Sequence, residues 1–295
     1  MEKGLITKSV SGQYTVRTEK DDYICKPRGL FRKENFKPLC GDFAEFEITD
    51  VSKKEGYIYK IKERKNSLVR PPVANIDTAV ILFSLTSPKW DELLIDLLIL
   101  ACKSNGIEAV LCINKTDLAK KEEIQEVFRQ YSESGCKIVT TDALQQVNFD
   151  DLSEILSKGI TVFAGQSGAG KSTLINSLTK TDFMPTGVLS RKIQRGKNTT
   201  RHCELLPFRE GYIVDTPGFS KFDPGLLNPD SIEKMYKEFE QYKGHCKFND
   251  CRHINELGCA VIKAVQDNLI SIERHNRYKM IYNMSKEALK IRRGY

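Results

Sequence analysis

One stretch of the sequence decides the fold, and it reads Gly165-Gln166-Ser167-Gly168-Ala169-Gly170-Lys171-Ser172. It matches the phosphate-loop pattern G-x-x-x-x-G-K-[ST] at every position. An apolar run at 159–164 precedes the stretch and a helical pattern at 171–179 follows it, which is the context that the pattern requires. The alternative, a glycine-rich turn without a ligand, is weakened by this context.

The residue types of this loop suit the phosphates of a nucleotide. Glycines let the backbone N–H groups curl around phosphate oxygens without Cβ clashes, and the helix that begins here points its positive end at the anion. Lys171 would reach the β- and γ-phosphates, and Ser172 would coordinate Mg²⁺. We therefore expect residues 165–173, which end with Thr173, to bind nucleotide.

A second motif indicates that the base is guanine. The chain carries Asn114-Lys115-Thr116-Asp117 directly after the apolar run 109–113. The carboxylate of Asp117 can accept hydrogen bonds from N1 and N2 of guanine, a pair of donors that adenine lacks. Asn114 can bridge the base and the phosphate loop, while the Lys115 stem covers the base. The alternative is a polar turn with Asp117 as a helix cap, but the phosphate loop favours guanine.

A third motif, Asp215-Thr216-Pro217-Gly218, follows the strand predicted at 212–214. An aspartate at the carboxyl end of a strand can hold Mg²⁺ through water, and the N–H of Gly218 can contact the γ-phosphate. Alone, this pattern is commonly a turn. Its distance from Ser172 leaves room for a helix, a switch loop and one more strand, as a Mg²⁺-assisted NTPase requires.

The order of the motifs is unusual. The N-K-x-D motif at 114–117 precedes the phosphate loop at 165–172, which precedes D-x-P-G at 215–218. An ordinary GTPase has the phosphate loop first and N-K-x-D last. The same sheet can form if the chain is circularly permuted, so the predicted fold is α/β with a circularly permuted P-loop GTPase domain. In that arrangement the switch after Asp215 leads directly into the C-terminal segment.

Changes in pattern predict three domains in the 295 residues. Residues 1–70 form short alternating strands, which suits an N-terminal β-barrel such as an OB-fold that binds RNA. Two prolines at 71–72 mark a boundary, and β and α patterns alternate over 71–224. Residues 225–295 are predicted to form a helical, zinc-binding domain. The net charge of +7 divides as +5, −2 and +4 over these segments, so the basic ends favour a polyanionic partner such as RNA.

Four candidate metal ligands lie close together near the C-terminus: Cys246, Cys251, His253 and Cys259. Three thiolates and one imidazole form a tetrahedral zinc set, and four protein ligands leave no open position, so the ion would be structural. Reduced cysteines without a metal are the alternative. His245 is a rival ligand, but ligands at adjacent positions are harder to aim at one metal. With nine cysteines and no pattern of an export signal, we expect no disulfide framework.

With these motifs in this order, the chain resembles the RsgA/YjeQ family of circularly permuted GTPases, which act in assembly of the bacterial small ribosomal subunit. The resemblance covers essentially the whole chain, including the junction at 63–77 and the C-terminal cysteine cluster. It implies an N-terminal OB-fold, a permuted GTPase domain and a C-terminal zinc domain. It also implies GTP hydrolysis to GDP and phosphate, stimulated by the 30S subunit late in its maturation, with 16S rRNA as a partner.

The resemblance also implies a catalytic set. Thr200, with Thr199 as the alternative, would close on Mg²⁺ in the GTP state, so that Ser172 and Thr200 hold the ion. The catalytic set is then Lys171, Thr200, Asp215 and Gly218.

The chain departs from related sequences at several positions. Asn198 stands where the family carries a histidine, so a catalytic role for that histidine does not transfer. Phe219 stands where Ras-like GTPases have a water-orienting glutamine, and we therefore expect slow hydrolysis without the ribosome. Gly168 replaces the asparagine of potassium-activated GTPases. The base-contact loop, usually Ser-Ala, reads Thr-Thr-Asp-Ala at 140–143, which leaves its assignment open.

Some expectations concern setting and alternatives. No apolar run approaches the ~18 residues of a membrane span, so we expect a cytoplasmic monomer. The basic segment after Ile270, with Arg274 and Arg277, is either a helix that contacts rRNA or a solvated amphipathic helix whose tyrosines pack inward. The alternative functions are a GTPase of another RNA pathway, and an RNA-binding assembly factor that uses the nucleotide only as a binding switch.

Overall fold

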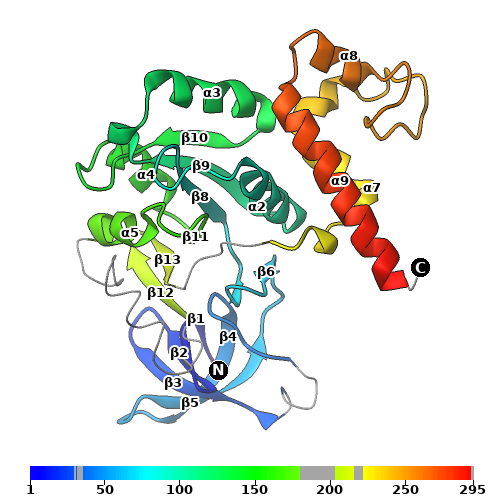
Figure 1. The fold of residues 1–295 in the computed structure, drawn as a ribbon. Helices are drawn as coiled ribbons and strands as arrows, with labels where there is room; N and C mark the ends of the chain where they lie inside the picture. The colour runs from blue at the N-terminus through cyan, green and yellow to red at the C-terminus, as the bar shows by residue number, and fades with distance from the viewer. Residues whose placement is uncertain (30, 32–35, 180–202, 216–221, 294–295) are drawn as a thin grey trace.

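The computed structural model describes residues 1–29, 31, 36–179, 203–215 and 222–293. The chain forms a barrel, a central sheet covered by helices, and a helical C-terminal part that lies beside the central sheet (Figure 1). Within the described ranges, no helix has both the length and the apolar character needed to cross a membrane.

The N-terminal part is a closed five-stranded barrel, as predicted. Its strands are β1 (Glu2–Val10), β2 (Gln13–Arg17), β3 (Asp22–Pro27), β4 (Phe43–Asp50) and β5 (Glu55–Ile61). Strand β1 pairs with both β2 and β4, and β3 pairs with β5 in parallel, which closes the ring. The alternating pattern turns Ile6, Val16, Phe46 and Ile58 into the barrel core. This strand order is that of an OB-like barrel.

The central sheet has the strand order β10-β9-β8-β11-β13-β12. Its strands are β8 (Thr78–Ser84), β9 (Glu108–Asn114), β10 (Lys137–Thr140), β11 (Ile160–Ala164), β12 (Cys203–Phe208) and β13 (Gly211–Asp215). All neighbours pair in parallel except β12 and β13, which are antiparallel. The phosphate-loop strand β11 therefore lies beside β8, which precedes it in the chain, as the circular permutation predicts.

Helices cover both faces of this sheet. Along β8, Ile81 and Phe83 face the core under α2 (Glu92–Ser104) and α3 (Lys121–Tyr131). Val80 and Leu82 face the core under α4 (Phe149–Ile155) and α5 (Lys171–Thr179). Because both faces are buried, β8 is a continuous apolar run rather than an alternating one. Short 3₁₀ turns lie at η1 (Thr116–Leu118) and η2 (Ser132–Ser134).

The barrel and the central sheet are joined by strand pairing. Strand β1 of the barrel pairs with β12 in the registers Lys8 to Glu204 and Ser9 to Cys203, which gives one sheet of eleven strands. The thiol of Cys40 donates to the carbonyl of Cys203 at 3.0 Å. A small hairpin of β6 (Ser67–Leu68) and β7 (Val73–Ala74) fills the boundary segment. The sequence pattern did not predict the pairing of β1 with β12.

The C-terminal part packs around a third core. Its elements are η3 (Pro224–Leu226), α7 (Pro229–Ile232), η4 (Glu233–Met235), η5 (Lys237–Tyr242), α8 (Ala260–Gln266) and α9 (Ile272–Arg293). Tyr236, Phe239 and Tyr278 are its largest buried rings, and they contact one another at centroid distances of 5.0–5.1 Å. This core also includes Leu97 and Leu100 of α2, so the C-terminal part packs directly on the central domain.

Candidate nucleotide and metal sites

The phosphate loop joins β11 to α5 and requires glycine at two positions. Gly165 has φ +123°, and a Cβ there would lie 2.0 Å from the carbonyl oxygen of Leu82. Gly170 has φ +97°, and a Cβ there would lie 2.3 Å from Nδ2 of Asn114. A side chain at either position would clash with a neighbouring strand. Glycine is therefore needed at both positions even before the space for phosphates is considered.

Lys171 lies at the first position of α5, with its ammonium folded over the loop. Its Nζ donates to the carbonyl oxygens of Gly165 at 2.7 Å and Gln166 at 2.6 Å. Burial lowers the pKa of Lys171 to about 8. Phosphates would supply the negative charge that this buried ammonium lacks. Ser172 and Thr173 follow in the first turn of the same helix.

Asn114 connects the base and phosphate parts of the site. Its Nδ2 donates to the carbonyl oxygen of Ala169 at 2.8 Å, and its Oδ1 accepts from the N–H of Ala143 at 3.1 Å. The side chain is 1% exposed, at the end of β9. One buried amide therefore brings together the N-K-x-D motif, the phosphate loop and the loop after β10.

Lys115 and Asp117 flank this contact. Lys115 has φ +61°, and its Nζ donates to the carbonyl oxygens of Gly168 at 2.9 Å and Ser87 at 2.6 Å. The Lys115 side chain therefore connects the phosphate loop with the segment that precedes α2. Asp117 lies in η1, where it is exposed. Its carboxylate is therefore accessible to a ligand.

The loop after β10 has a turn that is formed by Asp142. The Oδ1 of Asp142 accepts from the N–H groups of Leu144 at 2.8 Å and Gln145 at 3.0 Å. The next residue, Ala143, directs its N–H to Asn114. The loop after β10 therefore contacts the N-K-x-D motif through Ala143.

A contact to the start of α2 was not predicted. The Gln166 side chain accepts from the N–H of Asp91 at 3.1 Å and donates to the carbonyl oxygen of Lys89 at 3.3 Å. Asp91 in turn caps α2 through the N–H of Leu94, so this helix begins at Glu92. Gln166 is a variable position of the loop pattern, so the motif carries no signal for this contact.

Asp215 ends β13, the parallel neighbour of the phosphate-loop strand β11. The carboxyl ends of both strands thus lie at the same edge of the sheet, as a Mg²⁺-assisted site requires. Thr199, Thr200 and Gly218, the other residues assigned to the switches, lie outside the described residues. So do Asn198 and Phe219.

Comparison with known proteins agrees with this geometry. The RsgA GTPase family model matches residues 61–224, and the RsgA N-terminal domain model matches residues 3–58.

The chain belongs to the RsgA GTPase family.

It is therefore a GTP hydrolase. A relative from Caldanaerobacter subterraneus subsp. tengcongensis, named small ribosomal subunit biogenesis GTPase RsgA, is 41% identical over 291 residues, which cover 98% of each chain. A relative of the same name from Clostridium acetobutylicum is 40% identical over 293 residues and 99% of each chain.

Solved structures of the family share the fold. The crystal structure of YloQ, described as a circularly permuted GTPase, matches with a TM-score of 0.81 and 32% identity, over 97% of this chain and 96% of that one. YjeQ from Thermotoga maritima matches with a TM-score of 0.80 and 31% identity, over 96% and 98% of the two chains. The predicted permutation and the predicted family are confirmed.

The four predicted metal ligands lie together in the C-terminal part. Nδ1 of His253 lies 3.6, 3.5 and 3.3 Å from the sulfurs of Cys246, Cys251 and Cys259, and the sulfurs of Cys246 and Cys259 are 3.9 Å apart. A tetrahedral zinc ion with usual bond lengths gives edges of about 3.6 Å between sulfur and nitrogen and about 3.8 Å between sulfurs. The donor atoms therefore fit zinc in both chemistry and spacing.

Protonation states and hydrogen bonds at this cluster also suit a cation. Burial lowers the pKa of His253, which keeps the imidazole in the neutral form that binds metals. Burial raises the pKa of Cys251 to about 12, and a bound cation would reverse this effect by stabilising the thiolate. Two N–H groups at the start of α8, from Ala260 and Ile262, point at the sulfurs of Cys246 and Cys259 at 3.4 Å.

The structure corrects the interpretation of the basic C-terminal helix. Arg274 and Arg277 are 3% and 7% exposed and bind acidic residues inside the protein, so they are not available to RNA. Of the two alternatives, inward packing applies to Tyr278, which is buried and donates to the carbonyl oxygen of Arg252 at 2.5 Å. The exposed cations of α9 lie further along it, and they are Lys286, Lys290 and Arg292.

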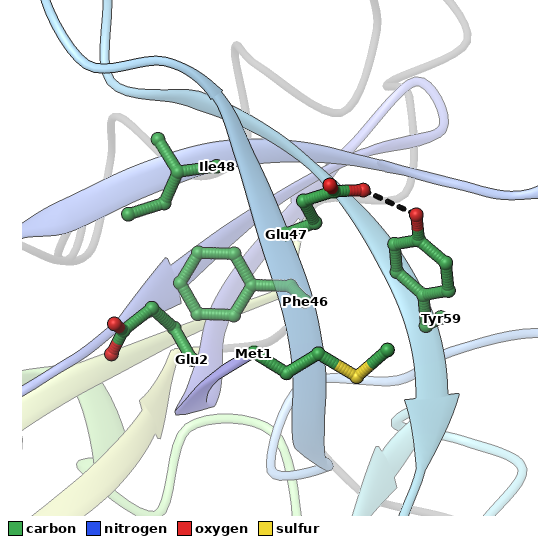
Figure 2. A pocket seen from close by; sticks show the side chains of 6 residues that line it. All are labelled: Met1, Glu2, Phe46, Glu47, Ile48 and Tyr59. Atoms are coloured by element: carbon green, nitrogen blue, oxygen red, sulfur yellow. Dashed lines mark hydrogen bonds between the residues drawn. The ribbon is translucent and has the colours of Figure 1, made fainter.

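The barrel surface carries an aromatic side chain next to a hollow. Figure 2 shows Tyr59 of β5 beside Phe46 and Glu47 of β4, with Met1 closing one side. The Arg28 guanidinium stacks over the Tyr59 ring at 3.4 Å, and the Tyr59 hydroxyl donates to the carboxylate of Glu47. The Arg28 side chain is 52% exposed, so this pair presents a cation and an aromatic ring on the barrel surface.

Proposed function

We propose that this chain is a GTPase that binds the 30S ribosomal subunit through its 16S rRNA and assists late maturation of the subunit, with hydrolysis of GTP to GDP and phosphate stimulated by the ribosome. The observation that carries this is the bridge made by Asn114, which links the guanine motif to the phosphate loop in a chain of the RsgA family. Relatives at about 40% identity bear the name of a small ribosomal subunit biogenesis GTPase.

In the proposed site, the phosphates occupy the loop of residues 165–173, and Lys171 turns from the loop carbonyls to the β- and γ-phosphates. Ser172 and Thr200 would hold Mg²⁺ directly and Asp215 would hold it through water. A bound Mg²⁺ supplies positive charge against the phosphate oxygens as negative charge develops during transfer. The N–H of Gly218 would contact the γ-phosphate.

Guanine would be selected by the exposed carboxylate of Asp117, which would accept from N1 and N2 of the base. Adenine lacks this pair of donors, because its N1 is an acceptor. The stem of Lys115 covers the base.

The zinc set Cys246, Cys251, His253 and Cys259 is proposed to be structural, because its four donors complete a tetrahedron. The domain limits 1–70, 71–224 and 225–295, the monomeric state and the cytoplasmic location also stand as proposals. For RNA contact, the barrel offers Arg28 and Tyr59, and α9 offers its exposed cations.

The test is GTP turnover measured alone, with 30S subunits and with 50S subunits as the control. We expect slow turnover alone, a large stimulation by 30S subunits and little by 50S. Lys171→Ala should abolish turnover, and removal of residues 1–70 should weaken binding to the subunit while the nucleotide still binds. Fast turnover without ribosomes would contradict the stimulated mechanism. Binding of GTP without turnover in any condition would favour the alternative, an assembly factor that uses the nucleotide only as a switch.

A further inference from the structure

His253 has a ring nitrogen that the candidate zinc site does not use. Its Nδ1 faces the three sulfurs, so its Nε2 points away from them. On that side, Nε2 lies 3.8 Å from Oε2 of Glu233, the first residue of η4. The ring is 4% exposed, so the two groups face each other away from solvent.

The Glu233 oxygen lacks a hydrogen bond. Among the described residues, Oε2 of Glu233 is one of four buried side-chain atoms without a hydrogen-bond partner. A buried carboxylate oxygen without a donor is costly, so such an atom calls for an explanation. Arg252 is the competing partner, but its Nη1 is 3.9 Å away, its side chain is one-third exposed, and it already pairs with Asp230 at 2.9 Å.

The backbone of His253 is held by other groups. His253 has φ +60°, and its carbonyl oxygen accepts from Nε2 of His275 at 2.7 Å. The carboxylate of Glu256 accepts from the N–H groups of Arg252 at 2.9 Å and Ile254 at 2.7 Å, on either side of the histidine. These contacts fix the position of the His253 backbone. They do not determine the rotation of its ring or which ring nitrogen carries the proton.

Metal binding would supply the missing donor. When zinc binds Nδ1 of a histidine, the ring proton resides on Nε2, and that N–H usually donates to a carboxylate or a carbonyl. The separation of 3.8 Å must shorten to about 2.9 Å for such a bond to form when the metal binds. Zinc on one side of the ring therefore gives the buried oxygen on the other side its partner.

We infer that Glu233 is a positioning residue of the zinc site, whose carboxylate accepts the Nε2–H of His253 and so fixes the ring tautomer and orientation for the metal. The inference rests on the zinc site proposed above. It assigns to Glu233 an effect on zinc affinity that a residue serving only to pack η4, or to pair with Arg252, would not have.

The experiment measures zinc on the full chain, by metal analysis of the purified protein and by competition with a chelator of known affinity. We expect Glu233→Ala to lower zinc affinity about 10- to 100-fold and to speed zinc release. Glu233→Gln, which keeps an acceptor of the same shape but no charge, should lie between this variant and the wild type. Asp230→Asn is the matched control, because it removes an acidic partner of Arg252 without facing the ring; its affinity should be unchanged.

A second readout uses Co²⁺ in place of zinc, since its visible absorption bands report the donor set and its geometry. The absorption bands should shift in the Glu233→Ala variant and stay at the wild-type positions in the Asp230→Asn variant. Wild-type zinc affinity and an unchanged Co²⁺ spectrum in Glu233→Gln and Glu233→Ala would overturn the inference, as would an equal loss in Asp230→Asn. If Glu233→Ala does not fold, Glu233→Gln decides by the same measurements. A wild-type protein that binds no zinc would instead refute the proposed zinc site itself.

Discussion

Arg274 on α9 donates from Nη1 to Oδ1 of Asp96 on α2 at 2.6 Å, across 178 positions of sequence. Both side chains are almost fully buried, at 3% and 1% exposed. Asp96 also accepts from Arg277 through its other oxygen, and Arg274 donates to Glu238 at 2.5 Å. The cluster therefore joins the C-terminal helix to the GTPase domain at a point where both arginines are buried.

The first prediction concerns this cluster. Asp96→Asn leaves two buried guanidinium groups without their shared carboxylate, and we expect a loss of about 3–5 kcal/mol in the free energy of unfolding. Trp90, the single tryptophan, stacks on Phe83 near α2, so its fluorescence in urea reports the transition. As a control, Glu126→Gln breaks an exposed pair with Arg129 and should cost less than about 1 kcal/mol. A similar small loss in both variants would contradict the prediction.

The second prediction concerns the pH dependence of nucleotide binding. Burial lowers the pKa of Lys171 to about 8 in the free protein, and the protonated form is the one that binds phosphate. GDP affinity should therefore be constant well below pH 8 and fall as the pH rises through 8, by about fourfold at pH 8.5. Calorimetry between pH 6.5 and 8.5 measures this. Lys171→Arg stays charged and should bind with a flat profile; a flat profile in the wild type would show the prediction wrong.

The third prediction concerns Gly170. An added Cβ there would lie 2.3 Å from the Asn114 amide, at a φ that side chains rarely adopt. Gly170→Ala should therefore displace Asn114 and weaken GDP binding by at least about tenfold, which equals about 1.4 kcal/mol. Gly106→Ala is the matched control, since its φ is also positive at +64° but no atom lies within 4 Å of the added Cβ. It should cost about 1 kcal/mol of stability and leave GDP affinity unchanged.

The fourth prediction concerns salt. The two basic ends of the chain are proposed to contact rRNA, whose phosphates release counterions when protein cations bind. Subunit binding should therefore weaken steeply and linearly on a log–log plot against salt concentration, whereas GTP binding should change less. Fluorescence titration of both equilibria over the same salt series tests this. Equal slopes for the subunit and for GTP would argue against the basic ends as RNA contacts.

The sequence motifs predicted the local structure around the candidate nucleotide site, because each motif has a local physical cause. The phosphate loop needs glycines at positive φ, a strand before it and a helix after it. All of these features depend on residues that are adjacent in the sequence. The cysteine and histidine spacing likewise predicted a cluster that the structure brings within 4.8 Å. The turn after β10 was harder to predict, because it depends on hydrogen bonds from Leu144 and Gln145 to the Asp142 side chain.

The charge pattern of the basic segment after Ile270 could not show which of its arginines are buried. Arg274 and Arg277 belong to a segment that is as basic as an RNA-binding helix. In the structure, however, both side chains pair with Asp96. A sequence pattern records that a residue is basic, but not whether an acidic partner far along the chain neutralises it. For Tyr278 the sequence left RNA contact and inward packing open, and the structure shows that the ring is buried.

The sequence alone thus determined the three motifs, their permuted order and the metal ligand set, because these depend on residues that are neighbours along the chain. The tertiary structure decided how they are assembled. It placed Asn114 between the base loop and the phosphate loop, paired β1 of the barrel with β12, and buried the α9 arginines against α2. These contacts join segments far apart in sequence, and their energies come from burial and from partners that exist only once the chain has folded.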